Sequence, residues 1–568
     1  MLRRASGLLL FAILTLILLP VQSSAARQPN VILITLESAR ADRMGFLGAR
    51  NRLTPQLDGL ARECIVFERA YAQSPGTVVS HATILSGTYP QTHHASELGD
   101  PISREVPYLP DLFHTRGYGT GAFVSTIALD PQNGLAPGFD RGFDTYDAGF
   151  HSEQPIARYG TSSGRSGDQV VTRATRWLTS NAGKPFFLWV ELSDVSADGR
   201  SYDRAIAGVD AAVGKLLTQL RTMKLYDDSI ILLASDHGES LGAHGEDTHG
   251  VFLYDDTIRV PLLVKLPQRQ MAGKRVRGRI RLLDIAPTAL EAARVPAPSQ
   301  MQGQSLLRIA KTNPDADQPV YAGSDFSQQA FGWSGLESWR AGKYLYIRAP
   351  KPELYDLAAD PAASRNLAQN SKATVETMAS QLEAFRNHFG RQNSKSTGNG
   401  LTSNEMQKLA SLGYVGLQKS SPRATSVATG VDPKDNISIA NQVLDAFAKL
   451  AAANAEAAAP VFQQALTAEP KAYLAQYGLG VALAQQKLYP QAIEQLHKAI
   501  ELQPTSVWAH YEMGATLAKT GDFKTAAVHL ELVCDRMPRF RQAHLLLAQS
   551  YEHLGQSKRA QIAREKAR

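Results

Sequence analysis

The sequence predicts an α/β/α sandwich with a mostly parallel sheet, followed by an all-α solenoid of paired helices. The sandwich is predicted because residues 27–389 alternate β-branched apolar runs with amphipathic helical patterns. The solenoid is predicted because residues 437–568 repeat a helical pattern every 34 residues. A chain of 568 residues also exceeds the usual size of one compact domain. We therefore expect two folded parts, joined over residues 390–436 by a polar linker.

Residues 1–26 have the order of a secretory signal peptide. Two arginines precede an apolar stretch over residues 7–20, and small residues follow up to Ala26. The apolar stretch is shorter than the roughly 20 residues that a membrane-spanning helix needs. We therefore expect cleavage near Ala25 or Ala26 and a periplasmic or secreted protein. Contact with a membrane is expected only if this segment stays uncleaved, as an anchor.

The charge and cysteine content exclude some classes of protein. The 60 Lys and Arg residues against 53 Asp and Glu give a net charge of +7, and they form no long cationic block. We therefore expect no nucleic-acid partner. Cys64 and Cys534 lie in different predicted domains. Both are expected to be buried thiols without a disulfide.

Four apolar runs in the front part are expected to be strands buried on both faces: "NVILITL", "KPFFLWVEL", "SIILLAS" and "VPLLVKL". Helical patterns lie between them, as in "TPQLDGLAREC" and "YDRAIAGVDAAVGKLLTQLRTM". Sheets of this kind gather their functional sites at the carboxyl ends of the strands. Polar residues at those ends are therefore candidate site residues.

Polar side chains follow two of these strands. Glu37 follows the first strand, and Asp236 and His237 follow a later one. Thr77 lies just before "SHATILSG", a predicted helix start, where free backbone N–H groups can hold phosphate or sulfate oxygens. Two carboxylates and an imidazole suit a divalent cation, which lowers the pKa of a nearby hydroxyl and neutralises a bound anion.

Six segments follow one another along the front part: "PNVILITLESARADRMGFLG", "TPQLDGLARECIVFERAYAQSP", "SHATILSGTYP", "SDHGESLGAHG", "LLDIAPTALEAA" and "ELYDLAADPAASRNLA". In this order they resemble the successive motifs of the sulfatase family, over about residues 28–385. That family lies within the alkaline phosphatase superfamily of metal-dependent ester hydrolases. The resemblance therefore implies the sandwich fold of that superfamily and a sulfate or phosphate ester as substrate.

The resemblance also implies residue roles. Glu37, Asp236 and His237 would bind one divalent metal ion. Thr77 would be the nucleophile and would itself lie at the metal. The resemblance leaves open whether the ion is manganese, zinc, magnesium or calcium.

Position 77 departs from the sulfatase pattern. A sulfatase carries Cys or Ser ten residues before the Gly of a "TGRYP" segment and oxidises it to formylglycine. Counted back from Gly87, that position is Thr77, whose Cβ methyl group prevents formation of the aldehyde. Together with Glu37 in place of the usual Asp, the set is similar to that of lipoteichoic acid synthase and related phosphotransferases. These enzymes attack phosphorus through threonine, so the chemistry leans towards phosphorus.

A second departure lies in "VELSDVSADG", where Glu191 and Ser196 replace expected histidines and weaken any second metal site. His249 is expected either to contact the metal or to stabilise the leaving oxygen. Each candidate also has a structural interpretation. Thr77 would be a helix cap, Asp236 and His237 would cap a turn, and His249 would be a surface histidine.

Three prolines in the back part stand 34 residues apart: Pro470, Pro504 and Pro538. Small residues such as Gly480 and Gly514 recur between them, where paired helices can touch. The pattern resembles the tetratricopeptide repeat, with units expected at about 439–472, 473–506 and 507–540 and a last one from residue 541. Such arrays present a concave surface, so we expect a protein or peptide partner.

We therefore expect an exported, metal-dependent hydrolase or transferase that acts on phosphate, phosphodiester or sulfate esters. Thr77 would attack the ester, and His249 would be the second catalytic residue. The alternative is a protein whose catalytic half has decayed. That protein would be a periplasmic scaffold, binding other proteins through its repeats.

Overall fold

The computed structural model describes residues 28–96, 99–133, 136–149, 165–193, 202–313, 315, 317–390 and 430–567. The predicted signal peptide lies outside the described residues, as do Ser196 and most of the predicted linker. None of the described helices is long and apolar enough to cross a membrane.

The front part is built on an eight-stranded sheet with the strand order β4-β3-β5-β1-β6-β7-β2-β8. The strands are β1 (Val31–Leu36), β2 (Ile65–Tyr71), β3 (Gly119–Phe123), β4 (Thr145–Asp147), β5 (Phe186–Leu192), β6 (Ile230–Ser235), β7 (Arg259–Lys265) and β8 (Arg275–Arg281). Only β7 runs antiparallel to its neighbours within this described sheet. The predicted mostly parallel sheet is therefore confirmed.

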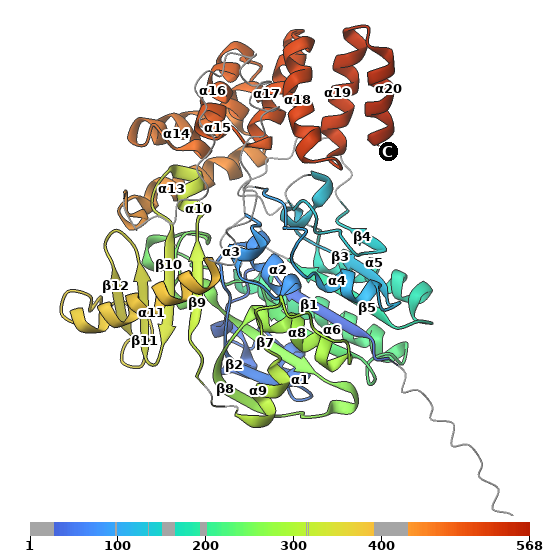
Figure 1. Cartoon of the computed structure of the whole chain (residues 1–568), viewed down its shortest axis with the longest axis vertical. Coiled ribbons are helices and arrows are strands. Elements are labelled where there is room, and N and C mark those ends of the chain that lie inside the picture. The colour runs from blue at the N-terminus through green and yellow to red at the C-terminus, as the bar shows by residue number, and fades with distance from the viewer. Residues whose placement is uncertain are drawn as a thin grey trace, which may run out of the picture.

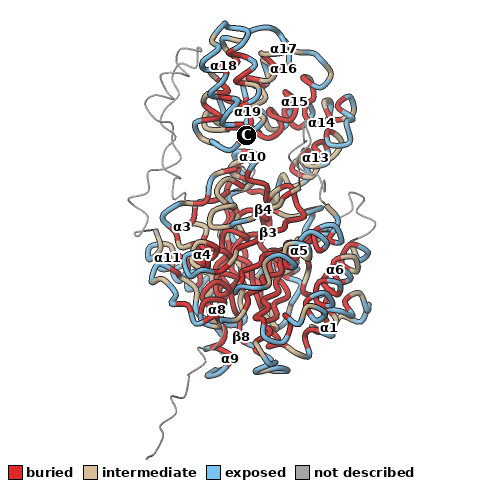
Figure 2. Tube along the Cα trace, turned by 90° about the vertical axis from the view of Figure 1, so that its right-hand side faces the viewer, coloured by how far each residue is buried: buried red, intermediate tan, exposed pale blue. Residues whose placement is uncertain are grey.

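Helices cover both faces of this sheet (Figure 1). One face carries α1 (Pro55–Ala61), α5 (Gly167–Asn181) and α6 (Tyr202–Thr222). The other carries α2 (Thr77–Ser86), α4 (Leu109–His114), α8 (Ile285–Ala292) and α9 (Leu306–Thr312). The strand β1 alternates between the two cores, because Leu33 packs on one side and Ile34 on the other. In Figure 2 the buried residues of the front part lie in its interior, and the exposed residues lie on its outside.

A second, antiparallel sheet follows, which the sequence analysis did not predict. Its order is β12-β11-β10-β9, with β9 (Val320–Ser324), β10 (Leu336–Ala341), β11 (Tyr344–Arg348) and β12 (Glu353–Asp356). The helix α11 (Lys372–Gly390) packs on it through Met378 and Leu382. The short helices α3 (Pro90–His93), α7 (Asp255–Ile258) and α10 (Phe326–Phe331) complete the front part.

The back part consists of four helix pairs, as the 34-residue period predicted. They are α13 (Pro433–Ala451) with α14 (Ala455–Ala468), α15 (Tyr473–Gln485) with α16 (Tyr489–Leu502), α17 (Val507–Thr520) with α18 (Phe523–Arg536), and α19 (Arg541–His553) with α20 (Ser557–Lys566). A Cβ atom at Gly480 would lie 2.7 Å from Leu496 of the paired helix. The recurring small residues therefore do let paired helices touch.

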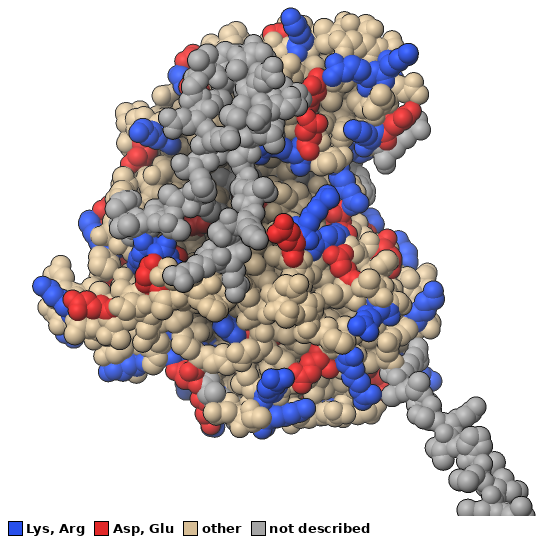
Figure 3. All heavy atoms as spheres, viewed as in Figure 1, with Lys and Arg blue, Asp and Glu red and all other residues tan. Residues whose placement is uncertain are grey.

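The repeat helices stack across one side of the sandwich (Figure 1). Phe331 and Trp333 of the front part belong to the same buried apolar cluster as the repeat residues. On the face drawn in Figure 3, Lys and Arg are interspersed with Asp and Glu. Cys64 and Cys534 are both buried free thiols, as predicted.

Candidate active site

The register of three neighbouring strands brings distant acidic residues to one edge of the sheet. The backbone N–H of Glu37 donates to the carbonyl of Leu192 at the end of β5, at 3.0 Å. The backbone N–H of Asp236 donates to the carbonyl of Leu36 at the end of β1, at 3.1 Å. The carboxyl ends of β1, β5 and β6 therefore meet, as the sequence analysis expected for Glu37 and Asp236.

Thr77 is the first residue of α2, and it is buried beside these strand ends. Its hydroxyl oxygen lies 3.1 Å from Nε2 of His237 and 3.4 Å from Oε1 of Glu37. The hydroxyl of Ser80, one turn further along, donates to the carbonyl of Asp236 at 2.5 Å. The structure therefore brings Thr77, Glu37 and the Asp236–His237 pair together. Gly76 is the N-cap of α2, so Thr77 does not occupy the cap position.

The backbone fixes the tautomer of His237. Its Nδ1 lies 2.8 Å from the carbonyl of Gly238, so Nδ1 carries the proton and donates. The lone pair of Nε2 is then directed at Thr77. Burial lowers the pKa of His237 well below its ordinary value, and the charge of His249 lowers it further. Only glycine fits at position 238, since a Cβ atom there would lie 2.0 Å from the carbonyl oxygen of Asp256.

His81 stabilises the first turn of α2 through a hydrogen bond to its backbone. Its Nδ1–H donates to the carbonyl of Thr77 at 2.8 Å, so its Nε2 accepts from the hydroxyl of Thr35 at 3.0 Å. The indole N–H of Trp189 donates to the same hydroxyl at 2.9 Å. Burial lowers the pKa of His81 to about 4, so this histidine stays neutral. It therefore supports Thr77 by orienting the backbone.

Asp236 presents one satisfied and one unsatisfied oxygen. Its Oδ1 accepts the backbone N–H groups of Ser38 at 3.0 Å and His237 at 2.7 Å. Among the described residues, none donates a hydrogen bond to its buried Oδ2. Burial, followed by the charge of Glu37, raises the pKa of Asp236 well above its ordinary value. Ser38 adopts a left-handed φ of 56°, so this strand end holds backbone strain beside the site.

Glu191 lies next to the site. The sequence analysis considered it only as a replacement for an expected histidine. Its Oε2 accepts the backbone N–H groups of Ser125 at 2.5 Å and Thr126 at 3.0 Å. Its Oε1 is buried and has no hydrogen-bond partner among the described residues. Burial and then the charge of Glu37 raise the pKa of Glu191 well above its ordinary value. An acidic residue inside the apolar run "FFLWVEL" was the sequence signal.

His249 forms a partly buried ion pair next to His237. Its Nδ1 lies 3.0 Å from Oε2 of Glu239, and the ring centroids of His249 and His237 are 4.3 Å apart. Burial lowers the pKa of His249, but the charge and hydrogen bond of Glu239 outweigh burial and raise it to about 10. His249 is therefore a cation at neutral pH, and its side chain is partly exposed. Glu239 was missed by the sequence analysis.

Whether the site suits a metal ion depends on the donor atoms of its side chains. As the side chains are placed, no group of three His, Cys, Asp or Glu residues within the described chain forms a metal-binding cluster. The chemistry of the donors nevertheless fits a cation. The unbonded Oδ2 of Asp236 and the lone pair of His237 Nε2 are buried at one point, beside the carboxylate of Glu37. Burial raises the pKa of Glu37 as well, although Ser193 donates to it.

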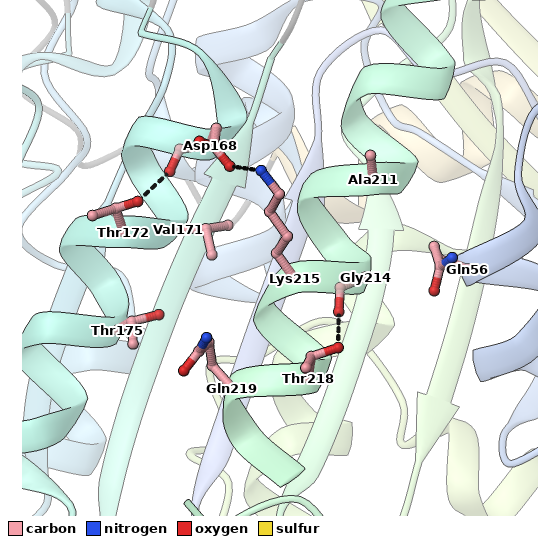
Figure 4. A pocket seen from close by; sticks show the side chains of 10 residues that line it. All are labelled: Gln56, Asp168, Val171, Thr172, Thr175, Ala211, Gly214, Lys215, Thr218 and Gln219. Carbon is pink, nitrogen blue, oxygen red and sulfur yellow. Dashed lines mark hydrogen bonds and ion pairs between the residues drawn. The ribbon is translucent and has the colours of Figure 1, made fainter. Parts of the chain in front are cut away.

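A separate cleft of about 630 Å³ lies between α5 and α6, at the helical surface (Figure 4). An ion pair between Asp168 and Lys215 crosses it. None of the residues that line this cleft belongs to the site at the strand ends.

Two family models match the front part of the chain. The family model described as sulfatase matches residues 29–195 and 196–295. A model described as the C-terminal region of N-sulphoglucosamine sulphohydrolase matches residues 248–388. The chain belongs to the sulfatase family. A tetratricopeptide-repeat model matches residues 446–507, so the predicted resemblances to the sulfatase family and to the tetratricopeptide repeat are confirmed.

Named relatives of this sulfatase-family chain cover most of its front part. It is 26% identical to an ulvan-active sulfatase of Formosa agariphila over an aligned length of 423 residues, which covers 64% of this chain and 82% of that protein. It is 24% identical to the N-acetylgalactosamine-6-sulfatase of Canis lupus familiaris, over 56% of this chain and 74% of that one.

Solved structures of the same fold include a phosphonate monoester hydrolase of Agrobacterium radiobacter. The TM-score is 0.54 at 19% identity, covering 64% of this chain and 96% of that one. A protein solved with its substrate D-glucosamine-2-N,6-O-disulfate gives the same TM-score at 18% identity, covering 66% and 100%. These similarities confirm the predicted sandwich fold.

Proposed function

We propose that this sulfatase-family protein hydrolyses sulfuric or phosphoric esters by direct attack of the Thr77 hydroxyl. The observation that carries the proposal is the position of that hydroxyl. It lies at the first residue of a helix, between the lone pair of His237 Nε2 and the carboxylate of Glu37. The positive end of the α2 helix dipole, where Thr77 lies, favours a bound tetrahedral anion.

A divalent cation supports this chemistry. Glu37, Asp236 and His237 would hold it, and when bound it would lower the pKa of the Thr77 hydroxyl and neutralise the ester oxygens. Its identity stays open among manganese, zinc, magnesium and calcium. The buried carboxylates favour such an ion because burial alone disfavours their charged forms.

In the proposed reaction Thr77 is the nucleophile and His249 is the general acid. Thr77 Oγ1 forms a bond to sulfur or phosphorus while the bond to the leaving oxygen breaks, and the Thr77 proton passes to Glu37. His249, held protonated by Glu239, gives a proton to the leaving alkoxide. Water then displaces the Thr77 oxygen, which takes back the proton held by Glu37, while one proton of that water passes to His249 and sulfate or phosphate is released. An acceptor alcohol in place of water would make the protein a transferase.

Two observations favour different esters. The curated relatives that match are named as sulfatases, which favours a sulfate ester. Thr77 stands at the position where formylglycine would form, and a threonine hydroxyl attacking directly favours phosphorus. The comparisons do not support the alternative of a decayed catalytic half that is only a scaffold. The signal-peptide pattern supports export to the periplasm or beyond.

A substrate panel tests the proposal. Aryl sulfate, aryl phosphate and aryl phosphodiester are each incubated with the full chain and with one of the four divalent ions, and a chelator serves as the blank. We expect metal-dependent release of phenol from at least one class. Failure with every ester and every ion would overturn the proposal.

A further inference from the structure

The first repeat helix, α13, lies against the loop that carries His249. We define the active-site loop as residues 238–254, between β6 and α7. The side chain of Asn441 on α13 accepts the backbone N–H of Asp247 at 3.2 Å and donates to the carbonyl of Gly245 at 2.8 Å. One side chain of the repeats therefore hydrogen-bonds to two backbone groups of a turn in this loop.

That turn is connected directly to the backbone beyond His249. Glu246 lies between the two residues that Asn441 holds, and its buried carboxylate accepts the backbone N–H groups of Val251 at 2.8 Å and Phe252 at 3.1 Å. Its carbonyl also accepts the N–H of Gly242 at 2.9 Å. A shift of the turn would therefore move the segment that contains His249.

A second contact holds the end of the active-site loop. Lys434, also on α13, lies 2.9 Å from Oε1 of the buried Glu353. Oε2 of Glu353 accepts the hydroxyl of Tyr254 at 2.6 Å. Tyr254 in turn stacks on His244 of the same loop, with ring centroids 3.6 Å apart. The same helix therefore contacts this loop directly through Asn441 and, about two helix turns earlier, indirectly through Lys434 and Glu353.

The remaining repeats fix α13 in place on the front part. The side chain of Gln503 donates to the carbonyl of Gln329, and Phe331 and Trp333 pack into the apolar core of the repeats. At the far end, Arg539 forms an ion pair with Asp140. The repeat array therefore contacts the front part at several points, and the position of α13 does not depend on a single contact.

We propose that the repeat array positions the catalytic centre of its own chain, and that Asn441 is the positioning residue that holds the active-site loop. Asn441 acts through the backbone of that loop on His249 and touches no reacting atom. The catalytic consequence rests on the function proposed above, whereas the mechanical coupling between α13 and the loop does not.

The mechanical part is tested by hydrogen exchange on the full chain. We compare wild type with Asn441→Ala and with Asn436→Ala, a matched control on the same helix whose side chain donates to Glu469 inside the repeats. We expect faster exchange over residues 242–252 in Asn441→Ala alone. Equal protection of this segment in all three proteins would overturn the proposal, whichever ester the protein hydrolyses.

The catalytic part is tested by a double-mutant cycle with His249→Gln, measured as kcat/KM on the ester that the panel identifies. Asn441→Ala is expected to lower kcat/KM about tenfold, from the loss of two hydrogen bonds. In the His249→Gln background it should have almost no further effect, since both changes act through one group. Fully additive losses would show that Asn441 acts elsewhere and would overturn its assignment.

Discussion

The hydroxyl oxygen of Thr77 lies 3.1 Å from Nε2 of His237, although 160 residues separate them in the chain. The contact exists because α2 begins beside the end of β6, where Ser80 bonds to the backbone of Asp236. A buried hydroxyl beside the three side chains that would hold a cation is placed to act as a nucleophile once that cation lowers its pKa.

Asp236→Asn is expected to separate metal binding from folding. Without metal the variant should be as stable as wild type or more stable, because folding buries a carboxyl oxygen that has no hydrogen-bond donor among the described residues. A cation at about one hundred times its Kd should stabilise wild type by about 2.7 kcal/mol, and this gain should vanish in the variant.

Urea unfolding with Mn²⁺ and with chelator measures both effects of Asp236→Asn. Asp168→Asn, which changes an exposed carboxylate, is the control and should keep the response to the ion. A full metal-induced gain in Asp236→Asn would exclude this residue as a ligand.

Glu239→Gln is expected to change the dependence of kcat/KM on pH. In wild type, His249 stays protonated up to its pKa of about 10. Without the Glu239 charge and hydrogen bond, burial lowers the pKa of His249 below its wild-type value, so the variant loses the proton at a lower pH than wild type. Its kcat/KM should therefore approach wild type at low pH and fall behind at high pH. The check is a pair of pH–rate profiles beside Glu376→Gln, an exposed change on α11; parallel profiles for Glu239→Gln and wild type would refute the role of the pair.

His81→Gln is expected to make stability less sensitive to acid. The folded state lowers the pKa of His81 from 6.5 to about 4, so between these values only the unfolded chain takes up a proton. Wild type therefore loses stability as pH falls through this window, by about 2 kcal/mol at about pH 5. The glutamine variant lacks this loss.

Urea unfolding of His81→Gln and wild type at about pH 8 and about pH 5 gives the difference. His114→Gln, at an exposed histidine, is the control and should follow wild type. If wild type and His81→Gln lose the same free energy of unfolding between the two pH values, His81 is not held neutral by the fold.

Part of the site could be predicted from the sequence because strand ends in a parallel sheet share an edge. Glu37, Asp236 and His237 follow strands that turned out to be neighbours, and the register brought them together. Glu191 and Glu239 were not recognised as site residues. Glu191 was judged by its place in a family motif, and its position inside an apolar strand was not considered. Glu239 lies in a loop whose path depends on tertiary contacts.

Other features could not be predicted because they depend on direction or docking. The apolar run of β7 identifies a buried strand but does not set its direction, which is antiparallel here. The sheet β9–β12 is made of short strands with weaker patterns. Nothing local in α13 indicates that Asn441 would bond to a turn in the active-site loop.

The central claim is that the Thr77 hydroxyl attacks the ester, and kcat/KM of Thr77→Ala against Thr77→Ser tests it most directly. The account predicts that the alanine variant loses at least about 10³-fold in kcat/KM while it still binds the metal ion. The serine variant keeps a hydroxyl and should stay within about tenfold of wild type. An alanine variant that turns over the ester at the wild-type rate would contradict the account.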